Sequence, residues 1–249
     1  MNVLAVVLTN DLSPPEPIAI TVALHQQGFE AAIKTLDDGS VAFDLGSGAE
    51  LAVVHFPTRH PEAGEMRRGP TTPSVDKIGS AGGHIVLGAL HLERLVGPNL
   101  EAIDRLMLRV TSAVVTTTDA VAAMLGHGVY FHEARIFTAL TVLYGEQRRV
   151  PAPIVINVTN GQSPVGRLTM LTHGLSRYGR MELLVGCTDD MDSSSSYIWQ
   201  MIEWLMADEL NRLVPGTLVP RDDGSEQVAQ GVPSPLGDGS AVVYIELGR

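Results

Sequence analysis

The sequence predicts an α+β fold with mixed, largely antiparallel sheets and helices packed on one face. Roughly ten short β-rich apolar runs alternate with roughly four or five segments of helical spacing. Glycine-flanked connections predict hairpins beside crossovers, and a β-α-β-β rhythm recurs, which favours two related halves. Hydrophobic residues make up 45% of the 249-residue chain and charged residues 18%, as in ordinary globular proteins.

The first half, residues 1–60, is expected to fold as β-α-β-β-β. A continuous apolar run predicts a strand at 3–8, and a helix follows Ser13 and its two prolines and stops at Gly28. We expect that helix to bury a stripe formed by Ile18, Val22 and His25. Short strands are expected at 41–43, entered through the turn 37–39, and at 51–54.

Residues 61–83 form a Pro/Gly-rich segment that is expected to connect the halves, since no apolar periodicity survives between 57 and 83. The second half, residues 84–249, is expected to be α+β as well, and the whole chain to form one compact unit. Its expected strands are 84–87, 128–131, 153–158, 168–173, 181–187 and 241–247. Its expected helices are 100–114, 118–126, 136–143 and one that begins at Asp192 or Ser193 and ends at Pro215-Gly216.

A hairpin between residues 168 and 187 is the most informative stretch. Gly174 and Gly179 flank four residues, which suits a four-residue hairpin loop. That loop places His173 opposite Arg180 and Leu171 opposite Glu182. Alternation then divides the side chains between two faces. One face holds Thr169, Leu171, His173, Arg180, Glu182 and Leu184, and the apolar face holds Met170, Thr172, Met181, Leu183, Val185 and Cys187.

The pattern Thr172-x-Gly174-Leu175 followed by Tyr178-Gly179-x-x-Glu182-Leu183 resembles the signature hairpin of a bacterial family catalogued as domain of unknown function 4261. His84 at the start of a strand and the last helix and strand, 193–213 and 241–247, are similar to that family as well. The resemblance covers roughly residues 50 to 247, except for 57–83, which do not align. The family has no assigned activity, so the resemblance implies a bacterial protein of unknown function and transfers no catalytic residue.

Charge and composition exclude several classes of function. With 28 Asp+Glu against 17 Lys+Arg the net charge is −11, and the basic doublets are Arg67-Arg68 and Arg148-Arg149, so nucleic-acid binding is disfavoured. No run reaches the length of a membrane span and no signal segment is recognised, which predicts a cytoplasmic protein without a membrane partner. The single cysteine, Cys187, excludes an intrachain disulfide and is expected to be a small buried hydrophobe.

His84, His173, Arg180 and Glu182 form the candidate polar cluster. Two imidazoles and a carboxylate suit an open metal site, so His84, His173 and Glu182 would serve a metal-assisted hydrolase. The helical H-E-x-x-H spacing is missing, and the alternative is structural ion pairing and hydrogen bonding at a sheet end. No metal, cofactor or catalytic residue is assigned.

Three other patterns favour a structural interpretation. Asp189, Asp190 and Asp192 precede a helix, where capping is favoured over calcium binding. The segment 161–166 lies between strands, so a hairpin connection is favoured over a phosphate cradle. A Ser176–His173–Asp189 triad is disfavoured, because no G-x-S-x-G turn holds the serine.

Tyr197, Trp199 and Trp204 on the last helix are a candidate partner surface, the alternative being a helix edge under a loop. The function that the sequence favours is a non-catalytic binding or regulatory module acting through protein contacts, with self-association as one form and a bacterial accessory or immunity role as a setting. The alternatives are the metal-assisted hydrolase and a small-ligand binder that uses a cleft between the halves.

Overall fold

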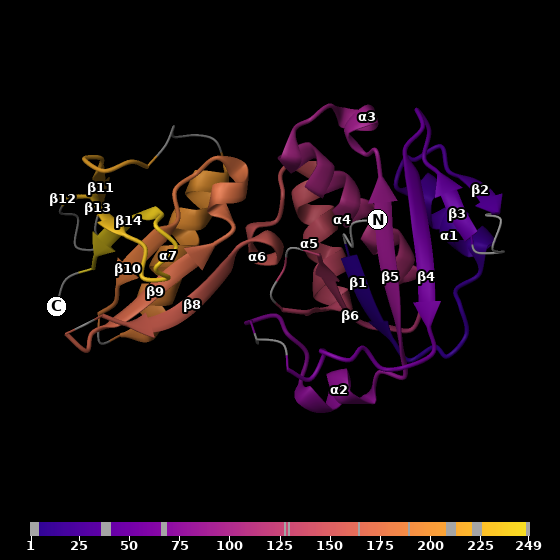
Figure 1. The fold of residues 1–249 in the computed structure, drawn as a ribbon, viewed down its shortest axis with the longest axis horizontal. Helices are drawn as coiled ribbons and strands as arrows, with labels where there is room; N and C mark the ends of the chain where they lie inside the picture. Colours follow the sequence, from indigo (N-terminus) through magenta and orange to yellow (C-terminus); the bar gives the residue numbers. More distant parts are fainter. Residues whose placement is uncertain are drawn as a thin grey trace. The chain divides into compact units, whose positions relative to one another are not determined.

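A computed structural model describes residues 5–35, 41–65, 69–126, 128, 130–163, 165–188, 190–207, 213–220 and 226–247. The chain divides into two compact units, unit 1 (Met1–Val155) and unit 2 (Ile156–Arg249). Each unit has its own sheet and its own helices, and the two are described separately (Figure 1).

Unit 1 contains a seven-stranded sheet in the order β2-β3-β4-β5-β1-β6-β7, and every neighbouring pair in it is antiparallel. Its strands are β1 (Ala5–Thr9), β2 (Ala32–Thr35), β3 (Val41–Asp44), β4 (Glu50–Phe56), β5 (Gly83–Leu90), β6 (Ala120–Leu125) and β7 (His132–Glu133). β1 lies inside this sheet, between β5 and β6, and all five of its residues are buried. Both faces of the sheet are therefore covered, as the continuous apolar run of β1 predicts.

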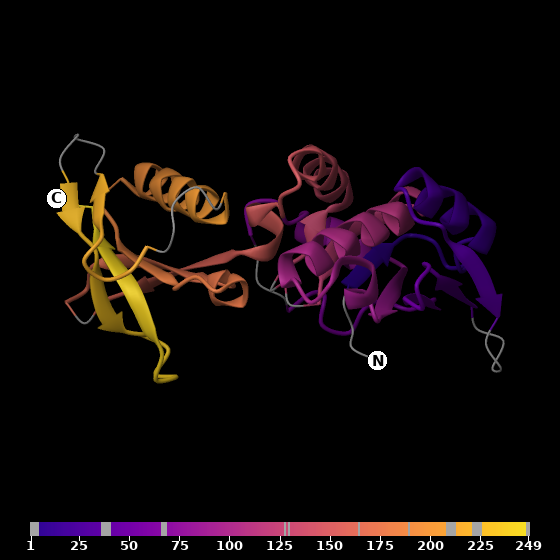
Figure 2. The same cartoon turned by 90° about the horizontal axis from the view of Figure 1, so that it is seen from above.

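The longer helices of unit 1 cover one face of this sheet, and Figure 2 shows α1, α4 and α5 on the same side of it. The helices are α1 (Pro17–Gln26), α2 (Val75–Ser80), α3 (Glu93–Val96), α4 (Leu100–Thr116), α5 (Ala134–Glu146) and α6 (Ala152–Val155). Side chains alternate along β1, so Ala5 and Val7 point to the opposite face from Val6 and Leu8.

The segment between β4 and β5 covers the other face. Val6 and Leu8 pack against Ala63 and Ile78, and Ile78 belongs to the short helix α2. This segment was expected to connect two halves. Its apolar side chains instead complete the core of unit 1. β1 and β6 carry apolar residues on this face as well, and the segment buries them.

Unit 2 contains a five-stranded sheet in the order β13-β14-β10-β9-β8 and a separate two-stranded ladder, β11-β12. Its elements are β8 (Asn157–Gln162), β9 (Leu168–His173), the 3-10 turn η1 (Leu175–Tyr178), β10 (Leu183–Gly186), α7 (Met191–Met206), β11 (Leu218–Pro220), β12 (Glu226–Val228), β13 (Gln230–Pro233) and β14 (Ala241–Glu246). β10 and β14 are parallel, and the connection between them contains α7. α7 buries the apolar residues that helical spacing in the sequence predicts, namely Ile198, Met201, Ile202 and Leu205.

The α+β class, with mostly antiparallel sheets, is confirmed. The division into halves differs from the predicted one, because β5 follows the segment 61–83 yet pairs with both β4 and β1 in one sheet. The chain therefore divides between Val155 and Ile156 into two compact units. No helix in the described part of the chain has both the length and the apolar character that a bilayer span requires.

Several predicted elements are wrong in detail. The helix expected at 118–126 is strand β6, because pairing with β1 overrides the helix preference of its alanines. Of the strand expected at 128–131, the described residues 128, 130 and 131 are not in a strand, and the short strand β7 follows them. The strand expected at 153–158 is divided between α6 and the start of β8. Outside the described residues lie predictions for positions 3–4, 37–39, 67–68, 189 and 210.

Candidate functional site

The hairpin that carries the family-like motif forms in unit 2, with β9 and β10 as its strands and η1 between them. Its register differs from the predicted one, because Leu171 lies opposite Leu184 rather than Glu182. Residues 174–182 connect the two strands as a 3-10 turn followed by a stretch outside both strands, and this connection is longer than the predicted loop. The alternation of faces therefore does not extend to Arg180 and Glu182.

The two glycines of the motif are explained by backbone geometry. Gly174 has a φ of 113° and Gly179 a φ of 73°, and these residues bound η1 at its two ends. A side chain is strongly disfavoured at such angles, so glycine is the residue that lets the chain enter and leave this tight turn. Leu175, between them, is fully buried and anchors the turn in the core of unit 2.

Glu182 holds this turn closed with both of its carboxylate oxygens. Oε1 accepts hydrogen bonds from the backbone N–H groups of Gly174 and Ser176, both at 2.9 Å. Oε2 accepts one from Thr172 Oγ1 at 2.8 Å and one from the Leu175 N–H at 3.3 Å. Thr172 Oγ1 in turn accepts the Leu183 N–H at 2.7 Å. The motif is therefore a structural clamp, and its carboxylate is fully used inside the hairpin.

The other members of the predicted cluster in unit 2 also have structural partners. His173 Nε2 lies 2.9 Å from Thr159 Oγ1 on β8. Arg180 donates from Nε to the Leu205 carbonyl oxygen on α7, at 2.9 Å, and from Nη1 to the Tyr178 carbonyl oxygen. His173, Arg180 and Glu182 do line one cavity of about 440 Å³. The structure thus brings these three residues together, and their observed bonds tie β8, the hairpin and α7 to one another.

His84 belongs to unit 1, at the start of β5. It is buried, its Nδ1 lies 2.8 Å from the Thr58 carbonyl oxygen, and its ring stacks on Phe56 at 4.8 Å between centroids. His60 approaches the same ring edge-on at 5.0 Å, and burial followed by the nearby His84 lowers the pKa of His60.

A metal site made of His84, His173 and Glu182 has no support, because the described residues include no group of three or more His, Cys, Asp or Glu side chains that could hold a metal ion. Two of the three residues lie in unit 2 and the third in unit 1. Ser176, which the disfavoured triad would use, contributes its backbone N–H to the Glu182 clamp. Asp189 lies outside the described residues.

For α7, the predicted capping at its start is confirmed, whereas the aromatic residues predicted as a partner surface are buried or half-buried. Asp190 is the N-cap, and its carboxylate accepts the backbone N–H groups of Asp192 and Ser193. These bonds, led by one from the Ser193 hydroxyl, lower the pKa of Asp190. Of the aromatic candidates, Tyr197 is buried and donates to the Pro220 carbonyl oxygen, whereas Trp199 and Trp204 are half-buried.

Cys187 is buried beside the start of α7, as its place at the end of an apolar run predicts. Burial raises the pKa of its thiol, with a smaller opposing effect of a hydrogen bond with Ser194. Both properties describe a packing residue rather than a nucleophile.

An exposed apolar surface lies on α1, where burial was expected. Ile18 is 70% exposed and Val22 50% exposed, while Ile20, Ala23 and Leu24 face the core. The predicted stripe of Ile18, Val22 and His25 is therefore on the outer side of the helix. Leu12, which is 65% exposed, and the exposed Pro14 precede it, and we call Leu12, Pro14, Ile18 and Val22 the α1 surface.

A cavity of about 490 Å³ adjoins the α1 surface at the start of the helix. Its lining is almost entirely apolar: Leu12, Pro14, Pro15, Pro17, Ile20, Val41, Phe43, Val53, Val54, His55 and Pro57. The one imidazole in this lining, His55, has its Nε2 3.1 Å from the Asp11 carbonyl oxygen. Prolines fix the backbone of one wall, so this cavity is preformed.

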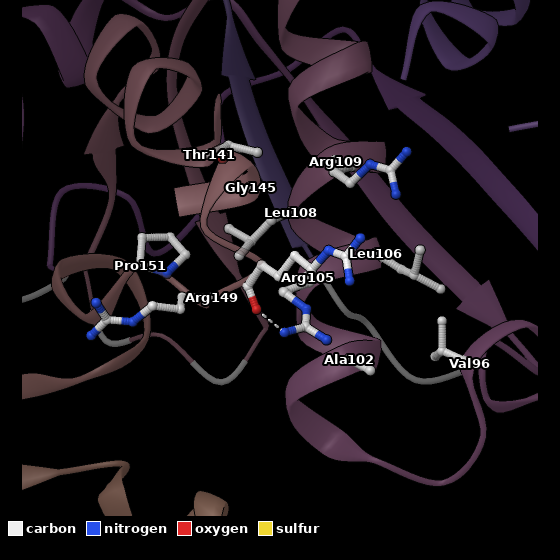
Figure 3. Close-up of a pocket in the computed structure, with 11 residues that line it drawn as sticks. Val96, Ala102, Arg105, Leu106, Leu108, Arg109, Thr141, Gly145, Arg149 and Pro151 are labelled. Atoms are coloured by element: carbon white, nitrogen blue, oxygen red, sulfur yellow. Dashed lines mark hydrogen bonds between the residues drawn. The ribbon is translucent and has the colours of Figure 1, made fainter. Parts of the chain in front are cut away.

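A second concave site in unit 1 gathers positive charge, and Figure 3 shows it between α4 and the end of α5. The cavity measures about 220 Å³. We call it the arginine pocket, and its lining is Val96, Ala102, Arg105, Leu106, Leu108, Arg109, Thr141, Gly145, Arg148, Arg149 and Pro151. Sequence reasoning recognised the doublet Arg148-Arg149 but not the site, because the packing of α4 on α5 is what brings it to Arg105 and Arg109.

Neighbouring groups position the guanidinium groups of Arg105 and Arg109. Arg105 donates from Nη1 to the Arg148 carbonyl oxygen, and its other partner is Glu101 at 3.7 Å, one turn earlier on α4. The Arg109 guanidinium carbon lies 4.9 Å above the centre of the Phe29 ring, and burial lowers the pKa of Arg109. The Arg149 guanidinium turns away from both in Figure 3.

No family model matches this chain, and no curated protein or solved structure matches it either. The resemblance of the hairpin motif to the uncharacterised bacterial family stays a prediction. The fold and the sites define an α+β protein of two compact units, with a structural clamp in unit 2 and two concave surfaces in unit 1.

Proposed function

We propose that this chain is a non-catalytic binding module that acts through protein contacts, and that the α1 surface is where a partner protein docks. The observation that carries the proposal is the exposure of Ile18 and Val22 on one face of α1, next to a preformed apolar cavity. Positions four apart on a helix are neighbours, so these two side chains form one continuous face. Contiguous exposed apolar surface of this kind is typical of interaction sites.

Folding leaves apolar side chains of the α1 surface in water. Burying one exposed Val, Leu or Ile side chain is favourable by roughly 1.5–3 kcal/mol. Leu12, Ile18 and Val22 are half or more exposed, so a partner that covers them gains a substantial part of that amount from each. An apolar side chain of the partner that fills the cavity adds to this gain, because the prolines of its wall have a fixed φ and therefore lose less backbone freedom on binding.

Charge identifies the kind of partner. Glu16 is exposed between Pro15 and Pro17, and its carboxylate makes no capping hydrogen bond to α1. The chain as a whole carries −11, so two copies repel each other and a partner with cationic residues is favoured. The occupant we propose is a segment of another protein with a bulky apolar residue near a lysine or arginine.

The test uses the full chain and a phage-displayed library of random linear peptides. Enriched peptides are expected to combine a bulky apolar residue with a nearby Lys or Arg. They are expected to bind the double variant Ile18→Ser/Val22→Ser about tenfold more weakly or worse, as loss of a binding hot spot would cause. The matched control is Val142→Ser/Leu143→Ser on α5, because its two side chains are 50% and 51% exposed.

Two results would contradict the proposal. One is an enriched set of peptides that binds the Ile18→Ser/Val22→Ser variant as tightly as the original chain, or no enrichment at all. The other is a dimer in sedimentation equilibrium that this double variant dissociates, since the occupant would then be a second copy of the chain. A monomeric chain is the result that the charge argument predicts.

A further inference from the structure

We propose that the arginine pocket of unit 1 binds the phosphate group of a small phosphate monoester. The proposal is independent of the α1 surface and depends on a gathering of charge that the rest of the chain does not predict. The chain has 17 Lys+Arg against 28 Asp+Glu, yet arginine supplies four of the residues that line this one pocket. None of the 11 lining residues, all of which lie in the described part of the chain, is acidic.

Arginines from α4 and from the residues after α5 line this one cavity. Arg105 and Arg109 are one turn apart on α4, where like charges repel. The hydrogen bond from Arg105 Nη1 to the Arg148 carbonyl oxygen fixes the Arg105 guanidinium beside the backbone that follows α5. Glu101 lies 3.7 Å from Arg105, but among the described residues no ion pair involves Arg109 or Arg148. The pocket thus keeps positive charge that a bound anion would neutralise.

The backbone of Arg148 gives a second reason to expect a ligand. Arg148 has a φ of +57°, and its N–H and that of Arg149 bond to the Gly145 and Tyr144 carbonyl oxygens. These bonds end α5 with a left-handed residue, a position where glycine is strongly favoured. An arginine at this position strains the fold, so its side chain is better explained by recognition than by stability.

The C-terminus of α5 does not by itself account for the cluster. A helix C-terminus carries about half a negative charge, which a single nearby guanidinium already offsets. Four arginines, Arg105, Arg109, Arg148 and Arg149, line the same pocket, and Glu101, 3.7 Å from Arg105, is an acidic partner of one of them. Their combined charge exceeds what the helix end can balance, whereas a phosphate monoester brings close to two negative charges and three acceptor oxygens.

The shape of the pocket limits what the phosphate is attached to. At about 220 Å³ the cavity is smaller than the roughly 300–1,000 Å³ of drug-sized ligand sites. Apolar side chains of Val96, Leu106 and Leu108 complete its walls. The fitting ligand is therefore a phosphate group with a short apolar body, and arginine forks recognise phosphate with matched geometry.

The test is a calorimetric titration of the full chain with phenyl phosphate, at constant ionic strength, beside inorganic phosphate, benzoate and a short RNA oligonucleotide. Phenyl phosphate is expected to bind more tightly than inorganic phosphate, because of its apolar ring, and more tightly than benzoate, because of its charge. Equal binding of benzoate, or displacement of phenyl phosphate by the RNA, would overturn the assignment to a small phosphate monoester.

The most informative variant is Arg148→Gly, because it removes a guanidinium and relieves the left-handed backbone at once. It is expected to melt at an equal or higher temperature and yet to bind phenyl phosphate about tenfold more weakly, as loss of a charge-assisted contact predicts. Arg105→Gln is expected to weaken binding as well. The matched control is Arg135→Gln, an exposed arginine on α5 outside the pocket, which should leave the affinity unchanged. Unchanged affinity in Arg148→Gly would refute the proposal.

Discussion

Replacement of Glu182 by alanine tests whether the family-like motif is a structural clamp. The variant leaves the Thr172 hydroxyl and three backbone N–H groups without their shared acceptor. Hydrogen bonds to a charged group contribute roughly 1.5–3 kcal/mol each. The bond from Leu175 is long, at 3.3 Å, and Ser176 is exposed to water, which can replace its bond. The Thr172 and Gly174 bonds dominate, so we expect a loss of about 3 kcal/mol.

The assay is urea unfolding of the full chain, followed by tryptophan fluorescence, because Trp199 and Trp204 both lie on α7 in unit 2. Glu182→Gln is expected to lose part of that stability, since an amide offers one acceptor oxygen where the carboxylate offers two. The matched control is Glu226→Ala on β12, an exposed carboxylate of the same unit. A midpoint for Glu182→Ala that equals that of Glu226→Ala would refute the clamp.

Three further predictions follow from single side chains. Burial lowers the pKa of His132 from 6.5 to about 4, so the unfolded chain binds a proton between these pH values that the folded chain does not. The contribution of His132 to the free energy of unfolding is therefore complete above pH 6.5, falls by about 3 kcal/mol as the pH drops to 4, and levels off below pH 4. The urea midpoint of His132→Gln should fall less over this pH range than that of the original chain, and an equal fall contradicts this prediction. Cys187 should react with a thiol reagent only after denaturant is added, and immediate labelling of the folded chain would be the contrary result. Asp190→Ala should lower the melting temperature and Asp190→Ser should largely restore it, whereas equal melting of all three proteins would disprove the capping role.

The sequence predicts the fold class well where local pattern and tertiary environment agree. The strand at 168–173 and the start of the long helix after Asp190 have the predicted position, because alternation and helical spacing match the faces that are buried, whereas that helix ends at Met206 and not at Pro215-Gly216. β6 escapes prediction because its alanines favour a helix and only the pairing with β1 makes them a strand. The same limit applies to α1, where the apolar residues at Ile18 and Val22 suggest the wrong buried side.

The candidate sites show a different limit. Thr172, Gly174, Gly179 and Glu182 were recognised as a pattern, but their mutual hydrogen bonds depend on the turn η1, which a simple hairpin register does not contain. The arginine pocket combines residues of α4 with residues of α5 and of the segment that follows α5. No spacing within either segment indicates that they meet, because their proximity comes from helix packing.

The central claim is that recognition takes place on unit 1 while the conspicuous hairpin of unit 2 is structural. Hydrogen exchange of the full chain, measured with and without a peptide enriched in the display experiment, tests this claim most directly. Slowed exchange is expected in residues 12–26 and 41–57, around α1 and the adjoining cavity. Slowed exchange confined to residues 168–187, with α1 unaffected, would contradict it.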